Sequence, residues 1–154
     1  MSNKLQVSLN KALKLTNVIS KEFEEKDFEN FDEEVVKMEN YIVSKGVLPL
    51  GPLIQYTNGF INENGQFEAK VLLMRQVSDH IQSTEEPYTY ESLISVKNCI
   101  YVRYVGDESN LKFAYDKLNL TAFEEEIPLK GNSYTVFVNK DEDTITADVF
   151  MEKA

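Results

Sequence analysis

The chain has 154 residues, 42% of them hydrophobic and 11% aromatic, and a formal net charge of −10 at pH 7. This length fits one domain with a substantial core, and the composition excludes wholesale disorder. The acidity argues against nucleic acid as a partner, because affinity for a phosphate backbone depends on clustered Lys and Arg. No run approaches the roughly 18 apolar residues of a membrane span, so we expect a cytoplasmic protein with no membrane partner.

The chain opens with a polar lead-in, residues 1–12, that we expect to be irregular or a short helix. Alternation and β-branched residues over 13–23 then indicate a strand. A helix follows, because Asn30 is a good N-cap and Gly46 is well placed to end the helix in a left-handed conformation. Its apolar stripe, which we assign to core packing, consists of Phe31, Val35, Met38 and Ile42.

A hairpin comes next. Two strand-like runs, 53–61 and 67–77, flank a turn that contains Asn64-Gly65, and this dipeptide supplies the positive φ angles of a tight turn. The polar stretch 78–91 reads as a linker, and it carries the single histidine, His80.

The second half predicts the same order of elements. Apolar residues occupy alternate positions over 92–105, which indicates a strand. Ser109 is a suitable cap for a second helix, whose apolar stripe runs from Leu111 to Ala122 and which we expect to fray early at Asn119 and Thr121. A turn at 140–143 then joins two strands, and the last of these runs to the C-terminus.

The two halves also resemble each other in sequence. The segment 48–58 is echoed by 127–139, and the alternating runs that follow, 68–74 and 146–152, correspond as well. Such self-similarity predicts two copies of one strand–helix–hairpin unit within a single domain, 13–154. We place the copies at about 13–77 and about 92–154.

Cys99 is the only cysteine, so an intrachain disulfide is excluded. It lies in an apolar run, where a small buried hydrophobe is expected rather than a nucleophile. With one histidine and no cysteine pair, we expect no zinc-type metal site, and the sequence predicts no cofactor.

Several segments together carry a family likeness: the Gly106 turn, Ala114-Tyr115-Asp116-Lys117-Leu118, Ile127-Pro128, 134–139 and 147–151. Over residues 12–154 the chain resembles the GyrI-like superfamily, which includes the effector-binding domains of multidrug-responsive bacterial transcription activators. The resemblance implies an α+β fold. Duplicated strand–helix–strand–strand units would form a curved antiparallel sheet with two helices, and a ligand groove would lie near the pseudo-twofold axis.

The family pattern in the penultimate strand is Tyr-Glu-x-Tyr-x-Asn, and here Thr135 and Phe137 replace its Glu and its second Tyr. An uncharged pocket floor removes the Coulomb attraction for a cation. The departure therefore argues against the binding of cationic drugs in the manner of the family.

Residues two apart on a strand share a face, and the repeat aligns Ile54 and Tyr56 with Thr135 and Phe137. We expect these four to line the groove, with Tyr104 and Tyr115 at its edge. Core packing is the alternative for each of them.

Charged residues on the closing strands offer a further candidate pair. The repeat places Lys70 opposite Asp148, so we expect Asp148 to line the groove and Lys70 to neutralise it. Two solvated charges are the alternative.

The resemblance favours a non-catalytic module that stands alone and binds a small lipophilic molecule between its repeats. The alternative is an accessory protein, for example one associated with a toxin or a secretion system, that binds a partner protein and no small ligand. A hydrolase is less favoured, because the sequence has no Gly-x-Ser-x-Gly motif and no histidine near the groove.

Overall fold

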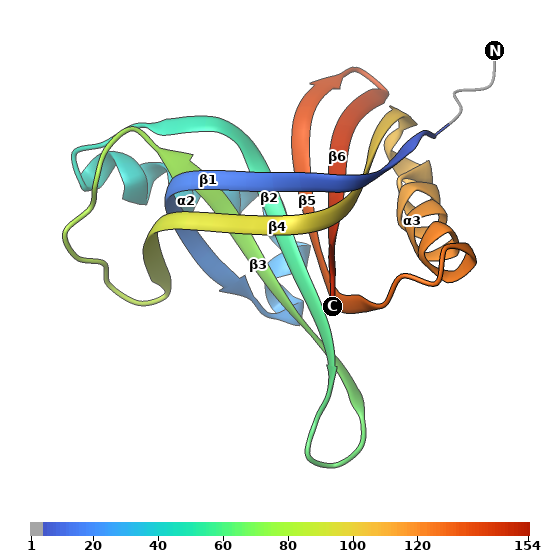
Figure 1. The fold of residues 1–154 in the computed structure, drawn as a ribbon. Helices are drawn as coiled ribbons and strands as arrows, with labels where there is room; N and C mark the ends of the chain where they lie inside the picture. The colour runs from blue at the N-terminus through green and yellow to red at the C-terminus, as the bar shows by residue number, and fades with distance from the viewer. Residues whose placement is uncertain (1–4) are drawn as a thin grey trace.

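The structure, a computed structural model that describes residues 5–154, contains two strand–helix–strand–strand units (Figure 1). The first consists of β1 (Val7–Phe23), a short α1 (Glu25–Glu29), α2 (Phe31–Ser44), β2 (Pro49–Ile61) and β3 (Phe67–Val77). The second consists of β4 (Tyr88–Asp107), the 3-10 turn η1 (Glu108–Asn110), α3 (Lys112–Glu124), β5 (Leu129–Asp141) and β6 (Thr144–Lys153). The predicted α+β class and the duplication are confirmed.

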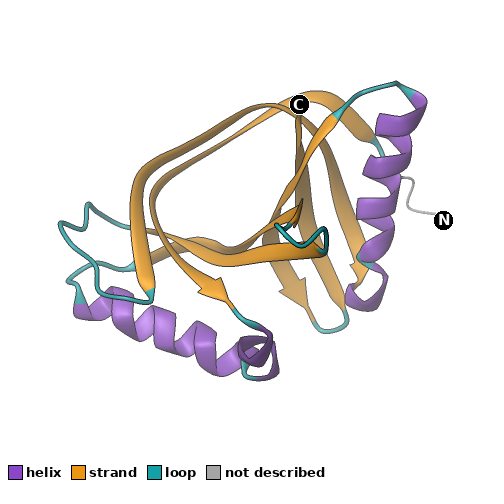
Figure 2. Ribbon diagram, turned by 90° about the horizontal axis from the view of Figure 1, so that it is seen from below, coloured by secondary structure: helices purple, strands orange, loops and turns teal. Residues whose placement is uncertain are grey.

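All strands pair antiparallel in the order β1-β3-β2-β5-β6-β4, and pairing between β4 and β1 closes the sheet on itself. Figure 2 shows α2 and α3 on the outside of this closed sheet. The sequence predicted a curved antiparallel sheet, and in the structure this sheet curves far enough to close into a barrel. No helix among residues 5–154 combines the length and the apolar character needed to cross a membrane.

Two strands start earlier than the sequence indicates. β1 begins at Val7, inside the expected lead-in, and β4 begins at Tyr88, inside the expected linker. The two extensions belong to one ladder, in which Val7 pairs with Val102 and Lys21 with Tyr88. Many side chains of the extensions are exposed, so their polarity concealed strand segments that pair with the predicted part of the other strand.

Three hydrophobic clusters hold the sheet and the helices. One lies in the interior of the closed sheet and includes Ile54, Tyr134 and Phe150. The other two lie between the sheet and its helices, below α2 around Met38 and below α3 around Leu118. Each strand therefore has an inner face toward the closed core and an outer face toward a helix or solvent.

Backbone conformations fix the alignment of the repeats. Gly46 and Glu126 end their helices with positive φ, and Gly51 and Gly131 repeat another positive φ, each pair being 80 residues apart. With this spacing, Gln55 of β2 is the equivalent of Thr135 of β5, and these two residues are also direct partners in the β2–β5 ladder. The pseudo-twofold axis therefore passes through the Gln55–Thr135 pair.

Candidate functional site

The eight predicted site residues divide between the two faces of the sheet. Ile54 pairs with Val136, and Tyr56 with Tyr134, so Ile54 and Tyr56 cannot share a face with Thr135. Directly opposed residues in an antiparallel pair lie on the same face, and a slip of one residue moves a side chain to the other face. The structure thus separates the residues in two groups: Ile54, Tyr56, Lys70 and Asp148 on the inner face, and Tyr104, Tyr115, Thr135 and Phe137 on the outer face.

On the inner face, Tyr56 stacks on Tyr134 with ring centroids 4.8 Å apart and an interplanar angle of 5°. Ile54, fully buried, belongs to the same cluster. Burial raises the pKa of Tyr134 to about 12, so its hydroxyl stays neutral at physiological pH. This part of the inner face is packed core.

Asp148 has a different partner from the one predicted. Arg103 donates to both of its oxygens, with Nε 2.8 Å from Oδ1 and Nη2 2.9 Å from Oδ2, and the Tyr101 hydroxyl donates to Oδ1 at 2.7 Å. Burial works to raise the pKa of Asp148, but the hydrogen bonds from Arg103 and Tyr101 outweigh it and hold the pKa below its usual range. The predicted neutralisation by Lys70 is wrong, because the ladders place Lys70 beside Asn58 on β3 and Asp148 beside Val136 on β6.

On the outer face, Tyr115 of α3 and Thr135 share a hydrogen bond between their hydroxyls. Thr135 is 1% exposed, and burial raises the pKa of Tyr115. Tyr104 belongs to the hydrophobic cluster between the sheet and α3, and its hydroxyl donates a hydrogen bond to the backbone oxygen of Asp107 at 2.5 Å. Thr135 stands where the family pattern has a glutamate. The site is therefore uncharged, and the Tyr115 side chain from α3 already makes the hydrogen bond to it.

Phe137 lines an open cavity on the outer face of the sheet. A cavity of about 330 Å³ lies between α2 and the β5–β6 hairpin. Its apolar lining comes from both repeats: Phe31, Val35, Leu53, Phe137 and Ile145. Its polar lining consists of Asp32, Glu108, Asn139 and Lys140.

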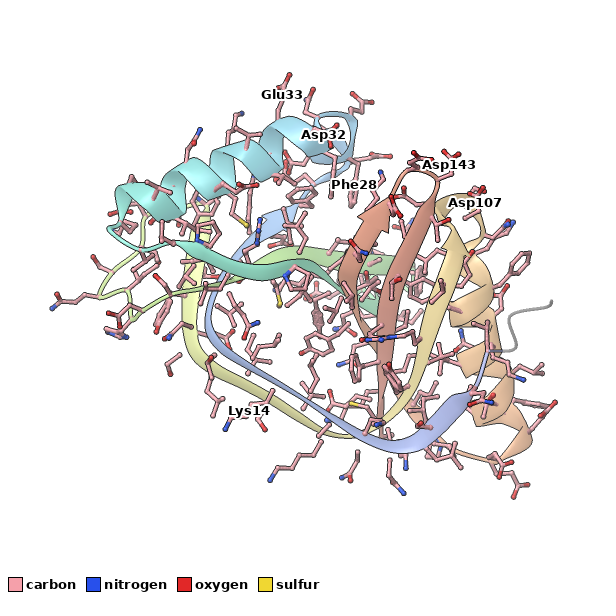
Figure 3. All side chains as sticks on the ribbon, turned by 90° about the horizontal axis from the view of Figure 1, so that it is seen from above. Lys14, Phe28, Asp32, Glu33, Asp107 and Asp143 are labelled. Atoms are coloured by element: carbon pink, nitrogen blue, oxygen red, sulfur yellow. The ribbon has the colours of Figure 1, made fainter. Side chains whose placement is uncertain are left out.

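The polar residues surround the mouth of this cavity and are exposed. Lys140 pairs with Glu108 at 3.2 Å, which leaves Asp32 as the second carboxylate of the rim. Figure 3 shows Asp32 at the start of α2, across from the turn between β5 and β6 that carries Asp143. The arrangement can enclose an apolar group and offers a charged contact only at its entrance.

Sequence reasoning assigned Phe31 and Val35 to core packing and did not consider Leu53. The structure buries Met38 and Ile42 of this helical stripe, and Phe31 and Val35 pack against the same core cluster as predicted, but they are half-buried and also line the cavity. The signal that could have separated them is their position in the first half of α2, which shares the cavity with Phe137 and Ile145 of the other repeat.

A second cavity, of about 480 Å³, lies at the inner face of the first repeat. Ser20 and Glu22 of β1, Lys70 and Leu72 of β3 and Glu91 of β4 contribute to its lining. Lys70 therefore lines a cavity, but Asp148 is not part of it, because β2 and β5 separate β3 from β6 in the sheet. Among residues 5–154, no group of three His, Cys, Asp or Glu side chains is arranged to hold a metal ion.

No protein-family model matches the sequence, and no curated protein is detectably similar to it. Among solved structures, EcmrR in complex with DNA matches with a TM-score of 0.73 and 16% identity, over 97% of this chain and 57% of the EcmrR chain. The C-terminal domain of EcmrR matches over 97% of this chain and 98% of the domain, with a TM-score of 0.70 and 14% identity. This chain thus spans little more than half the length of the complete EcmrR chain.

Two further matches bear on ligands and activity. SAV2435 bound to tetraphenylphosphonium has a TM-score of 0.55 and 10% identity, over 98% of this chain and 94% of its own. A hydrolase from Listeria innocua has a TM-score of 0.56 and 8% identity, over 94% of this chain and 91% of its own. At these identities the likeness concerns the fold alone: the chain shares its fold with the C-terminal domain of EcmrR and with SAV2435.

Proposed function

We propose that the chain is a non-catalytic module that binds a small lipophilic molecule in the cavity between α2 and the β5–β6 hairpin. The observation that carries this proposal is an apolar cavity with lining residues from both repeats. Its volume lies at the lower end of the range that is usual for small-molecule sites. Tetraphenylphosphonium, bound by the structurally similar SAV2435, is a lipophilic molecule of the expected class.

The charges around the cavity predict a weak preference between cations and anions. Thr135 is hydrogen-bonded to Tyr115, so no carboxylate lies at the pseudo-twofold axis. The rim carboxylate of Asp32 is exposed to solvent, and exposed ion pairs contribute at most about 1 kcal/mol. Binding free energy should therefore come mainly from burial of apolar surface, and charge should change the affinity little.

The lining supports binding rather than catalysis. The residues around the cavity include no serine, cysteine or histidine, and the only basic side chain, Lys140, is paired with Glu108. Covalent hydrolysis needs a nucleophile oriented by a general base, and these nine residues include no such pair.

The test is calorimetric titration with tetraphenylphosphonium and with tetraphenylborate, which have similar shapes and opposite charges. We expect both to bind, with dissociation constants within about fivefold of each other. Val35→Tyr should abolish binding, because the new ring fills the cavity. Val36→Tyr is the matched control, since Val36 is 55% exposed on the other side of α2. Equal binding by wild type and Val35→Tyr would place the ligand elsewhere and overturn the proposal.

A specific observation supports the accessory-protein alternative. Three large apolar side chains of α3, Phe113, Leu120 and Phe123, are 51%, 52% and 81% exposed. They lie on one side of the helix, away from the cavity. Failure of both probes to bind the wild-type chain would leave this alternative as the better account.

A further inference from the structure

The β2–β3 hairpin extends beyond the closed sheet as an isolated two-stranded ribbon. β5 pairs with β2 only as far as Asn58, and β1 pairs with β3 only from Val71 onward. Residues 67–70 of β3 pair only with residues 58–61 of β2. Figure 1 shows the ribbon pointing away from both helices. The outer backbone edge of β3 over residues 67–70 therefore has no neighbouring strand within the described structure.

The side chains along this edge have a symmetric pattern of charge. Glu68, Ala69 and Lys70 follow one another, and all three are exposed. Glu68 and Lys70 lie on one face of the ribbon, with Ala69 on the other. A twofold axis through Ala69 would place Glu68 of one copy of this segment opposite Lys70 of a second, antiparallel copy.

We propose that the free edge of β3 pairs with the same edge of a second copy of this chain, antiparallel and centred on Ala69. Each Glu68 then lies opposite Lys70 of the other copy, so the pairing makes two cross-strand ion pairs related by the twofold axis. Cross-strand pairs of opposite charge stabilise an antiparallel ladder, whereas like charges in the same positions destabilise it. Backbone hydrogen bonds of the added strand supply the affinity, as in other cases of strand addition.

The other face of the ribbon contributes apolar contacts to the same arrangement. Phe67 and Ile61 are direct partners in the β2–β3 ladder and are 71% and 66% exposed. They share their face with Ala69, whose small side chain would lie at the axis beside Ala69 of the second copy. Each Phe67 ring lies over Gly59 of β2 in its own ribbon, on the side away from the free edge, so Ala69 supplies the apolar contact at the axis.

The charge of the whole molecule makes this edge the favourable place for self-association. Each copy carries a net charge of −10, so most approaches of two copies bring acidic surfaces together. The edge segment 67–70 contains one acid and one base and is neutral. Because only a few residues of each copy take part, the dimer should be weak and concentration-dependent.

Sedimentation velocity of the full chain, from about 10 µM to about 1 mM, tests the pairing in the range expected for a small interface. We expect a monomer–dimer equilibrium. Glu68→Lys and Lys70→Glu should each weaken it at least tenfold, because each change places like charges opposite one another. The double variant Glu68→Lys/Lys70→Glu should restore it, because the reversed charges again oppose each other across the axis.

Glu63→Lys is the matched control, since Glu63 lies in the turn of the same ribbon and outside the proposed ladder. It should leave dimerisation unchanged. Charged residues also protect exposed edges from pairing, and if that is their whole role here, the chain will stay monomeric at every concentration. A monomer throughout, or a double variant that folds normally by circular dichroism without recovering the dimer, overturns the proposal. Binding of tetraphenylphosphonium should be the same in all four variants, because the cavity lies away from the ribbon.

Discussion

The two repeats place different chemistry at equivalent positions. Lys21 lies four residues after the positive-φ Asn17, and Val102 lies four residues after the positive-φ Asn98. In the first repeat Lys21 forms a buried ion pair with Glu34 of α2, and Asp27 lies 3.7 Å from the same ammonium. In the second repeat, fully buried Val102 belongs to the apolar cluster below α3. The fold therefore accepts either an ion pair or an apolar contact between a strand and its helix.

The repeats also differ in how tightly equivalent side chains are packed. Val35 borders an open cavity, whereas its equivalent 80 residues later, Tyr115, fills the corresponding space and bonds to Thr135. On the inner face, Leu72 lines the second cavity, whereas its equivalent on β6, Asp148, is enclosed by Tyr101 and Arg103. Space is therefore left beside Val35 and Leu72 of the first repeat, whereas the equivalent residues of the second repeat, Tyr115 and Asp148, are enclosed by hydrogen-bonding partners.

The largest expected effect comes from breaking the ion pair of the first repeat. Burial works to lower the pKa of Lys21, but the hydrogen bond to Glu34 and the charges of Glu34 and Asp27 raise it overall. Because the folded pKa is raised, the stabilisation is complete at pH 7 and is lost only as the pH rises through that value. Glu34→Ala leaves the ammonium buried and should lower the free energy of unfolding by about 3 kcal/mol, measured by urea denaturation at pH 7.

The double variant Lys21→Val/Glu34→Ala transfers the residues of the second repeat into the first. It should recover most of the lost stability, to within about 1 kcal/mol of the wild type, because a packed apolar pair can replace a buried ion pair. A double variant no more stable than Glu34→Ala would show that the two repeats are not interchangeable at this position.

A smaller effect is expected from opening the filled repeat. Tyr115→Val should cost about 2 kcal/mol, through a cavity beside Thr135 and the loss of a hydrogen bond. Tyr115→Phe separates the two causes, because it removes the hydroxyl alone and should cost about 1 kcal/mol. Benzene should raise the melting temperature of the Val variant more than that of the wild type, since a dry apolar cavity binds it. Equal costs for the two variants would mean that the ring fills no essential space.

The sequence predicted the elements and their duplication because those depend on local patterns. The helix stripes and the Asn64-Gly65 turn were sufficient for this purpose. The sequence did not predict that β1 and β4 extend along each other, since that pairing joins residues such as Val7 and Val102 that are far apart in the chain. Long-range pairing of polar segments leaves no periodic signal.

The site was harder to predict because it depended on an alignment accurate to one residue. Pairing Pro49 with Pro128 gives a spacing of 79, and pairing Asn58 with Asn139 gives 81, whereas β2 and β5 align in the structure with a spacing of 80. The better guides were Gly51 and Gly131, because glycine there serves a backbone conformation and not a variable side chain. An error of one residue placed Ile54 and Tyr56 on the wrong face, and the cavity residues of α2 were then missed.

The smallest expected effect concerns the enclosed carboxylate of the second repeat. The hydrogen bonds from Arg103 and Tyr101 lower the pKa of Asp148, so its contribution to stability is present above the unfolded value, near 3.9, and is lost as the pH falls through the folded value. Because Arg103 is half exposed, Asp148→Asn should cost only about 1 kcal/mol at pH 7.

The difference between this variant and the wild type should shrink as urea denaturation is repeated at decreasing pH below 4, because the protonated carboxyl and the amide then behave alike. Leu72→Asn is the matched control at the equivalent position of the first repeat, where no such carboxylate exists. Its cost should not depend on pH in this range. A pH-independent cost for Asp148→Asn as well would mean that Asp148 acts through packing, and the contrast between an enclosed charge in one repeat and an open cavity in the other would lose its electrostatic basis.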